Sequence, residues 1–216
     1  MWTRIWLKKW EYEVAASDVS TLLVLDIDGT VSAQDGIAMA RHWGEVFVSP
    51  SAETAWHTFC LAPRLGEAIS VYLIDGMSNT KVMWLTSVDA EDIDGVEDLL
   101  GFGRLAIIDP WMDTWDPSSE ASIAAKARAL KGYLEARLDQ FQCVIWIDDD
   151  LRPDTGVWPN DASYSPHEAV MSVLPFGDYD VPVIVGAPDP ACGVSLALLS
   201  SVEAVYTDWW RTHLEE

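Results

Sequence analysis

Three short apolar runs that each end in polar side chains constrain the fold of this chain more than any other feature. The runs are 21–25, 82–85 and 144–147, and the residues that follow them are Asp26, Thr86 and Asp148. Such short apolar runs are typical of strands that are buried on both faces, as in a parallel sheet. Ligands of open parallel sheets bind beyond the carboxyl ends of the strands. The polar residues at these ends are therefore the first candidates for a functional site.

Segments with helical spacing alternate with these runs, which indicates the α/β class with a doubly wound parallel sheet. Two further strands are expected at 105–108 and 181–185. We expect a hairpin of strands 45–49 and 55–61 joined around Pro50 and Ser51. The expected helices are 63–72, 90–100 (closed by Gly101), 118–138 and 195–212. The apolar face of the last helix is predicted to carry Leu196, Leu199, Val202, Val205 and Trp209.

The charge of the chain excludes one group of functions. The 216 residues include 35 acidic and 13 basic ones, a formal net charge of -22. Such a surface repels nucleic acids and anionic membranes, so bulk coating of either is excluded. Half of the residues are hydrophobic, which indicates a packed core and not a disordered chain. The acidity alone is compatible with a solubility device, salt adaptation, an acidic decoy or a metal site.

The N-terminal residues 1–20 are treated as an extension of a single domain, 21–216. Lys8 and Lys9 fall where a signal peptide would be apolar, and no apolar run reaches the length of a membrane span. With three scattered cysteines, a cytoplasmic protein is the default expectation. Trp2, Trp6 and Trp10 recur every four residues and would share one helix face. This face either docks on the protein's own core or forms a dimer contact or surface anchor.

The first strand runs into a D-x-D-G-T motif, which places two carboxylates, Asp26 and Asp28, just beyond its end. Gly29 permits a sharp turn, and Thr30 can hydrogen-bond that turn. An ordinary turn could have this sequence. A calcium loop is excluded because no further oxygen ligands follow at the required spacing.

Three further segments contain candidate site residues, and their order along the chain is more specific than any one of them alone. Thr86 and Ser87 follow the second run and offer hydroxyl donors. Lys126 lies on the long helix before the third run, where a lone lysine is usually a surface charge. Asp148, Asp149 and Asp150 follow the third run directly, and adjacent carboxylates repel one another unless a cation or solvent offsets them. A metal site is therefore favoured over a solvated turn.

Taken together, these segments resemble the haloacid dehalogenase (HAD) superfamily of phosphohydrolases over residues 20–150. The resemblance implies a HAD-like sheet, Mg²⁺ as cofactor and phosphomonoester hydrolysis through an aspartyl-phosphate. Its pattern is matched by Asp26, Asp28, Thr86, Lys126, Asp148 and Asp149.

The resemblance also implies a role for each of these residues. Asp26 would be the nucleophile and Asp28 the general acid and then base, while Lys126 would neutralise charge. Lys131 is the alternative lysine, only five residues away. Mg²⁺ would be held by Asp26, the backbone carbonyl of Asp28 and the carboxylate of Asp148, with Asp149 as a second ligand or a supporting group. Thr86, with Gly29, Thr30 and Ser87, would contact the phosphoryl group.

A narrower likeness, carried by segments such as 84–87, 146–150 and 188–195, is to a bacterial and phage branch associated with nucleic-acid repair. It implies a polynucleotide 3′-phosphate end as substrate. The segment 31–81 is read as a flap or minimal cap that leaves the site open. Trp43, Trp56, His42 and His57 could cover the site or pack within the hairpin. The alternatives are a nucleotide or small-metabolite phosphatase, favoured by the net charge, and an acidic non-catalytic interaction protein on a HAD scaffold.

Overall fold

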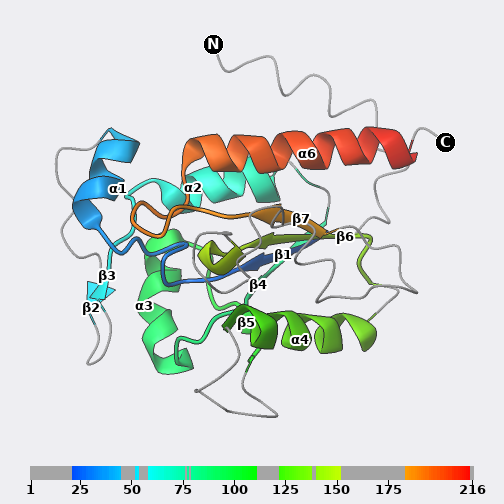
Figure 1. The fold of residues 1–216 in the computed structure, drawn as a ribbon, viewed down its shortest axis with the longest axis horizontal. Helices are drawn as coiled ribbons and strands as arrows, with labels where there is room; N and C mark the ends of the chain where they lie inside the picture. The colour runs from blue at the N-terminus through cyan, green and yellow to red at the C-terminus, as the bar shows by residue number, and fades with distance from the viewer. Residues whose placement is uncertain are drawn as a thin grey trace, which may run out of the picture.

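A five-stranded parallel sheet with helices places the protein in the α/β class (Figure 1). The computed structural model describes residues 21–44, 52–53, 58–75, 77, 79–110, 122–137, 140–151 and 183–214. The strand order is β5-β4-β1-β6-β7, with β1 at the centre. The strands are β1 (Thr21–Leu25), β4 (Thr80–Trp84), β5 (Ala106–Ile107), β6 (Cys143–Ile147) and β7 (Val183–Gly186). All five predicted sheet strands are present: β1 has the predicted bounds, and the ends of the other four are shifted by at most two residues.

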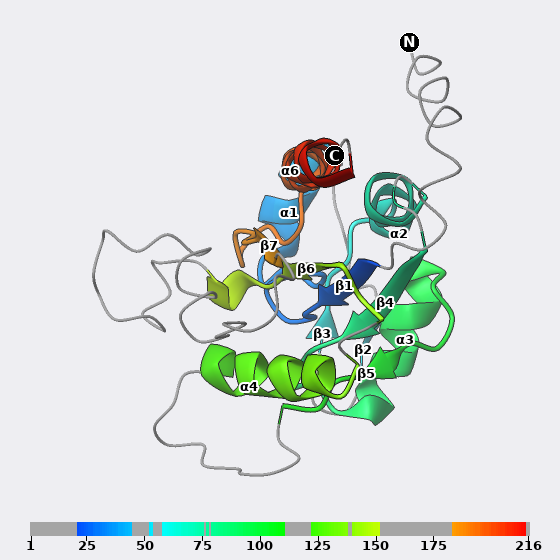
Figure 2. The same ribbon diagram turned by 90° about the vertical axis from the view of Figure 1, so that its right-hand side faces the viewer.

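Helices lie on both sides of this sheet. Figure 2 shows α2 (Leu65–Ile69) and α6 (Leu196–Leu214) over one face and α4 (Ser122–Glu135) over the other. The remaining helices are α1 (Gly36–Trp43) and α3 (Ala90–Leu100), and a π-helical turn, η3 (Ser70–Ile74), continues α2. Helix α3 has the predicted bounds, and Gly101 ends it in the left-handed conformation that glycine adopts readily.

The pleat of the central strand divides the core into two clusters. Leu23 and Leu25 of β1 are fully buried against α2, α3 and α6, whereas Leu22 and Val24 are buried against α4. Alternate residues of a strand point to opposite faces, so a strand that is covered on both faces must be apolar throughout. This burial explains why the sequence of β1 is a continuous apolar run. Strands β1 and β6 pair in a parallel register in which Leu25 lies beside Ile147.

Two expectations about the helices are wrong. Helix α1 was not expected, although Asp35 caps its start by accepting hydrogen bonds from the N–H groups of Ile37 and Ala38. In α6, Leu196 and Val205 of the predicted apolar face are exposed, by 47% and 54%. The predicted Leu199 and Val202 are buried, and Tyr206 joins them on a face whose spacing of three and four residues follows one side of the helix.

An antiparallel strand pair is present in the region of the predicted hairpin, and its second strand lies within the predicted 55–61. Its strands are β2 (Ala52–Glu53) and β3 (Thr58–Phe59), which pair antiparallel, and Figure 1 shows them beside α1 at one end of the molecule. The predicted strand 45–49 and its turn at Pro50 and Ser51 lie outside the described residues. So do the extension with Trp2, Trp6 and Trp10, and also Trp56 and His57. Among the described helices, none combines the length and apolar composition that a membrane span requires.

Candidate active site

The candidate site lies where the polypeptide leaves the central strands. The N–H of Asp26 donates to the carbonyl of Ile147 at 3.0 Å, and the N–H of Asp148 donates to the carbonyl of Gly186 at 3.0 Å. These bonds extend the sheet ladder by one residue beyond β1 and β6. The two carboxylates are therefore held at neighbouring strand ends by backbone that the sheet fixes.

The turn after Asp26 packs against the turn after β6. Gly29 has a φ of 73°, and a Cβ atom there would collide with the carboxylate of Asp149. The Thr30 hydroxyl donates to Asp149 Oδ1 at 3.0 Å and accepts from the Asp149 N–H at 2.9 Å. The carbonyl of Thr30 accepts from the N–H of Val194 at 2.8 Å. The observed role of Thr30 is thus to orient Asp149, and its predicted contact with a substrate stays a prediction.

Lys126 reaches this cluster from α4 and is almost completely buried. Its Nζ lies 3.0 Å from Asp26 Oδ2, 2.9 Å from Asp148 Oδ2 and 3.5 Å from Asp150 Oδ2. Lys131, the other lysine considered, is partly exposed and pairs with Glu135 at 3.6 Å. The structure therefore brings Lys126, and not Lys131, to the carboxylates.

Burial and mutual repulsion set the protonation of these groups. Burial by itself lowers the pKa of Lys126, but Asp148, Asp26 and Asp150 outweigh it and raise that pKa well above its ordinary value, so the ammonium stays charged. Burial raises the pKa of Asp148, an effect that Lys126 partly offsets. Burial and the charges of Asp26 and Asp150 raise the pKa of Asp149 to about 6. The site therefore gathers more carboxyl groups than one lysine can neutralise, and their raised pKa values reflect this excess.

Hydrogen bonds distinguish the two adjacent acids, Asp148 and Asp149. Asp148 Oδ2 accepts from Lys126 Nζ and, at 3.2 Å, from the indole N–H of Trp146, while its Oδ1 accepts from the N–H of Asp150 at 3.0 Å. Donors thus occupy both oxygens of Asp148. Among the residues that the structure describes, the Asp149 carboxylate accepts one side-chain hydrogen bond, from Thr30 to Oδ1. Asp149 consequently has the more available oxygen.

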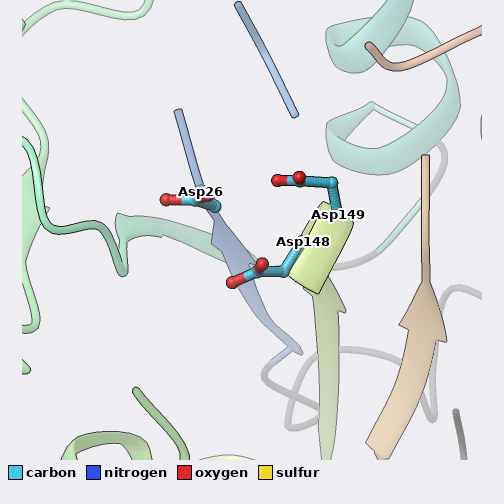
Figure 3. Close-up of side chains that lie close together, drawn as sticks. All are labelled: Asp26, Asp148 and Asp149. Atoms are coloured by element: carbon cyan, nitrogen blue, oxygen red, sulfur yellow. The ribbon is translucent and has the colours of Figure 1, made fainter. Parts of the chain in front are cut away.

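The carboxylates of Asp26, Asp148 and Asp149 form a group that could hold a metal ion. One oxygen from each lies within 4.8 Å of the others, and all three residues are buried. Figure 3 shows the three side chains at the ends of β1 and β6 with their carboxylates on the same side. Clustered carboxylate oxygens are ligands that hard divalent cations such as Mg²⁺ prefer.

The other predicted site residues lie at the same edge of the sheet but outside this group. Asp28 is exposed, and its carboxylate is not one of the three clustered ones. Thr86 is buried and follows β4, which pairs with β1, and its Oγ1 accepts from the N–H of Val88 at 3.3 Å. Ser87 is exposed. Trp43, at the end of α1, donates its indole N–H to the carbonyl of Val194 and packs against the core, and the packing within the hairpin considered for it stays a prediction.

Two residues of the site were not predicted from the sequence. The sequence indicates only that Trp146 belongs to a buried strand, but it lies two residues before Asp148 and so points to the same side of the chain. Asp150 was noted only as part of an acidic run, and it contacts Lys126. The period of two along a strand was the available signal for Trp146.

The fold and the site together define an α/β protein with a buried carboxylate–lysine cluster at the carboxyl ends of its central strands. Comparisons of the chain with protein families, with curated proteins and with solved structures found no match.

Proposed function

We propose that this protein is a Mg²⁺-dependent phosphomonoesterase with a HAD-like, doubly wound domain. The observation that carries the proposal is the convergence of Asp26, Lys126, Asp148 and Asp149, which are scattered through the sequence, at one edge of the parallel sheet. A buried nucleophile candidate beside a permanently charged lysine is what phosphoryl transfer needs for positioning and charge neutralisation.

The donor set fits a magnesium ion. Asp26 and Asp149 would be its direct carboxylate ligands, because donors already occupy both oxygens of Asp148. Asp148 would then mainly hold Lys126 in place, which reverses the preference for Asp148 drawn from the sequence, although both acids lie in the oxygen cluster. A bound Mg²⁺ would supply positive charge for the oxygens of the phosphoryl group. The contact of the Asp28 backbone carbonyl with the metal stays a prediction.

Three residues of the protein would carry out nucleophilic attack, acid–base catalysis and binding of the phosphoryl group. Asp26, held by the Ile147 carbonyl and by Lys126, would attack the phosphorus and form an aspartyl-phosphate. Asp28, which is exposed and follows β1 two residues after Asp26, would protonate the leaving oxygen and later take a proton from the water that attacks the aspartyl-phosphate. Thr86 uses its oxygen as an acceptor, so its hydroxyl proton is directed to a phosphoryl oxygen in this proposal.

The substrate class is a second part of the proposal. Within segment 31–81, α2 packs into the core with α3 and α6, so the part suited to a flap is the β2–β3 hairpin. A site without a large cap would admit a phosphate on a bulky carrier, such as a polynucleotide 3′ end. The net charge of -22 favours instead a nucleotide or small metabolite.

The test is phosphate release with and without Mg²⁺, from p-nitrophenyl phosphate, mononucleotides and 3′-phosphorylated oligonucleotides at matched salt. We expect release that requires Mg²⁺ and that Asp26→Asn abolishes. Lys131→Met, a change on the same helix as Lys126, should retain activity. Full activity of Asp26→Asn would refute the mechanism, and a preference for mononucleotides would remove the polynucleotide reading.

A further inference from the structure

Three carboxylates surround the ammonium of Lys126: those of Asp148 and Asp150 accept hydrogen bonds from it, and that of Asp26 forms an ion pair with it. A lysine ammonium carries three N–H groups, and the Nζ of Lys126 lies within 3.5 Å of three carboxylates, those of Asp26, Asp148 and Asp150. The proposed function requires this ammonium to neutralise a phosphoryl group. One of the three carboxylates must therefore give up its place when phosphate binds.

The contacts indicate which carboxylate is exchangeable. Asp148 is fully buried and its oxygens accept two further hydrogen bonds, while Asp26 is 5% exposed and follows the central strand. Asp150 makes the longest contact, 3.5 Å, and its side chain is 24% exposed. It lies in the 3₁₀ turn η4 (Asp149–Leu151), beyond the sheet ladder.

The backbone of Asp150 does not need to move for this exchange. Its N–H is bonded to Asp148 Oδ1 at 3.0 Å, which fixes the main chain independently of the side chain. Rotation of the side chain alone would transfer its carboxylate from Lys126 to water. Because solvent already reaches this carboxylate, the cost of hydrating it is lower than for the two buried acids.

We propose that the Asp150 carboxylate occupies, on Lys126, the place of a phosphoryl group and is displaced when phosphate binds. This inference rests on the proposed phosphatase function. Asp150 is then an internal competitor that weakens the binding of every phosphorylated ligand. It also selects for the phosphoryl dianion, because a doubly charged group competes for the ammonium better than a singly charged one.

The test compares Asp150→Asn with the wild type and with Asp98→Asn, which removes one exposed acidic charge near the end of α3. Binding of inorganic phosphate is measured calorimetrically in the presence of Mg²⁺, and KM and kcat are measured with p-nitrophenyl phosphate. A negative charge a few ångströms from the phosphoryl group weakens binding by about tenfold or more. We therefore expect Asp150→Asn to lower both the Kd of phosphate and KM by about tenfold. Its kcat should change far less, and Asp98→Asn should leave Kd and KM unchanged.

The outcomes separate this inference from the function on which it rests. An unchanged or weaker phosphate affinity of Asp150→Asn, with native circular dichroism, overturns the inference, because Asp150 would then position Lys126. Tighter phosphate binding without hydrolysis of any monoester supports the role of Asp150 and overturns the phosphatase proposal. Asp150→Ser serves as the second variant if the asparagine variant does not fold, with the same expected direction.

Discussion

Replacement of Lys126 by methionine should strongly destabilise the protein. Methionine fills a similar volume but removes the only positive charge that directly contacts Asp26 and Asp148 among the described residues. At 3 Å and an effective dielectric constant of about 20, each contact is worth about 5 kcal/mol before the cost of desolvation. Removing one partner of a buried ion pair typically costs about 3–5 kcal/mol after that correction. We expect a loss in this range from the free energy of unfolding at pH 8 without Mg²⁺.

The loss should depend on pH in a defined direction. The pKa of Asp148 is already raised in the folded protein, and removal of Lys126 would raise it further. A carboxyl whose pKa is higher in the folded than in the unfolded state contributes stability below its unfolded pKa, which is lost as the pH rises through the folded value. Lys126→Met should therefore be less destabilising at pH 5 than at pH 8. Mg²⁺ at pH 8 should restore part of the stability by replacing the lost positive charge.

Urea unfolding at both pH values, with EDTA or Mg²⁺, measures these quantities. Lys131→Met is the matched control, because it deletes a partly exposed lysine of the same helix that pairs with Glu135 at 3.6 Å. Its expected cost is about 0.5 kcal/mol or less. Similar costs for the two variants, or a pH-independent cost of Lys126→Met, would refute the reasoning.

Two further predictions concern Asp149 and the turn that supports it. Gly29→Ala should destabilise the protein more than the control Gly44→Ala does, and it should also weaken the stabilisation by Mg²⁺. Both glycines have a φ near 74°, but only at Gly29 would a Cβ atom meet the Asp149 carboxylate. Thermal unfolding of both variants checks this, and equal shifts would contradict it. The pKa of Asp149 is raised to about 6 without metal, so stabilisation by Mg²⁺ should rise from about pH 4 to above pH 6 as this carboxyl ionises. A calorimetric Mg²⁺ affinity that is constant over that range would exclude Asp149 as a ligand.

The sheet strands and the two acids that follow them, Asp26 and Asp148, were predictable because short local patterns in the sequence indicate them. Burial on both faces makes β1 and β6 continuously apolar, and the chain becomes polar where each strand ends, at Asp26 and Asp148. The buried face of α6 is less predictable, because apolar residues occur on several sides of this helix and the sequence does not show which side the sheet covers. Val205 is exposed although Tyr206, one position later, is buried.

The electrostatics of the site could not be derived from local pattern. Helical spacing does not reveal that the Lys126 side chain is only 3% exposed, since its burial depends on how α4 lies on the sheet. Among the described residues Asp148 accepts more hydrogen bonds than the Asp149 side chain does. This difference depends on Trp146, on the strand before them, and on Thr30, 119 residues away from Asp149. The order of the motifs in the sequence identifies the residues of the site. Their separate roles, such as positioning Lys126 or binding a metal, follow only from the three-dimensional contacts.

The central position of β1 has a consequence for synthesis on the ribosome. This strand is made before both of its sheet neighbours, β4 and β6, which begin at Thr80 and Cys143. Until those segments leave the exit tunnel, a strand with four consecutive apolar residues, 22–25, has two unpaired edges, which favours association with other nascent chains or with chaperones. Slow elongation between Leu25 and Ile147 should therefore lower the yield of folded protein.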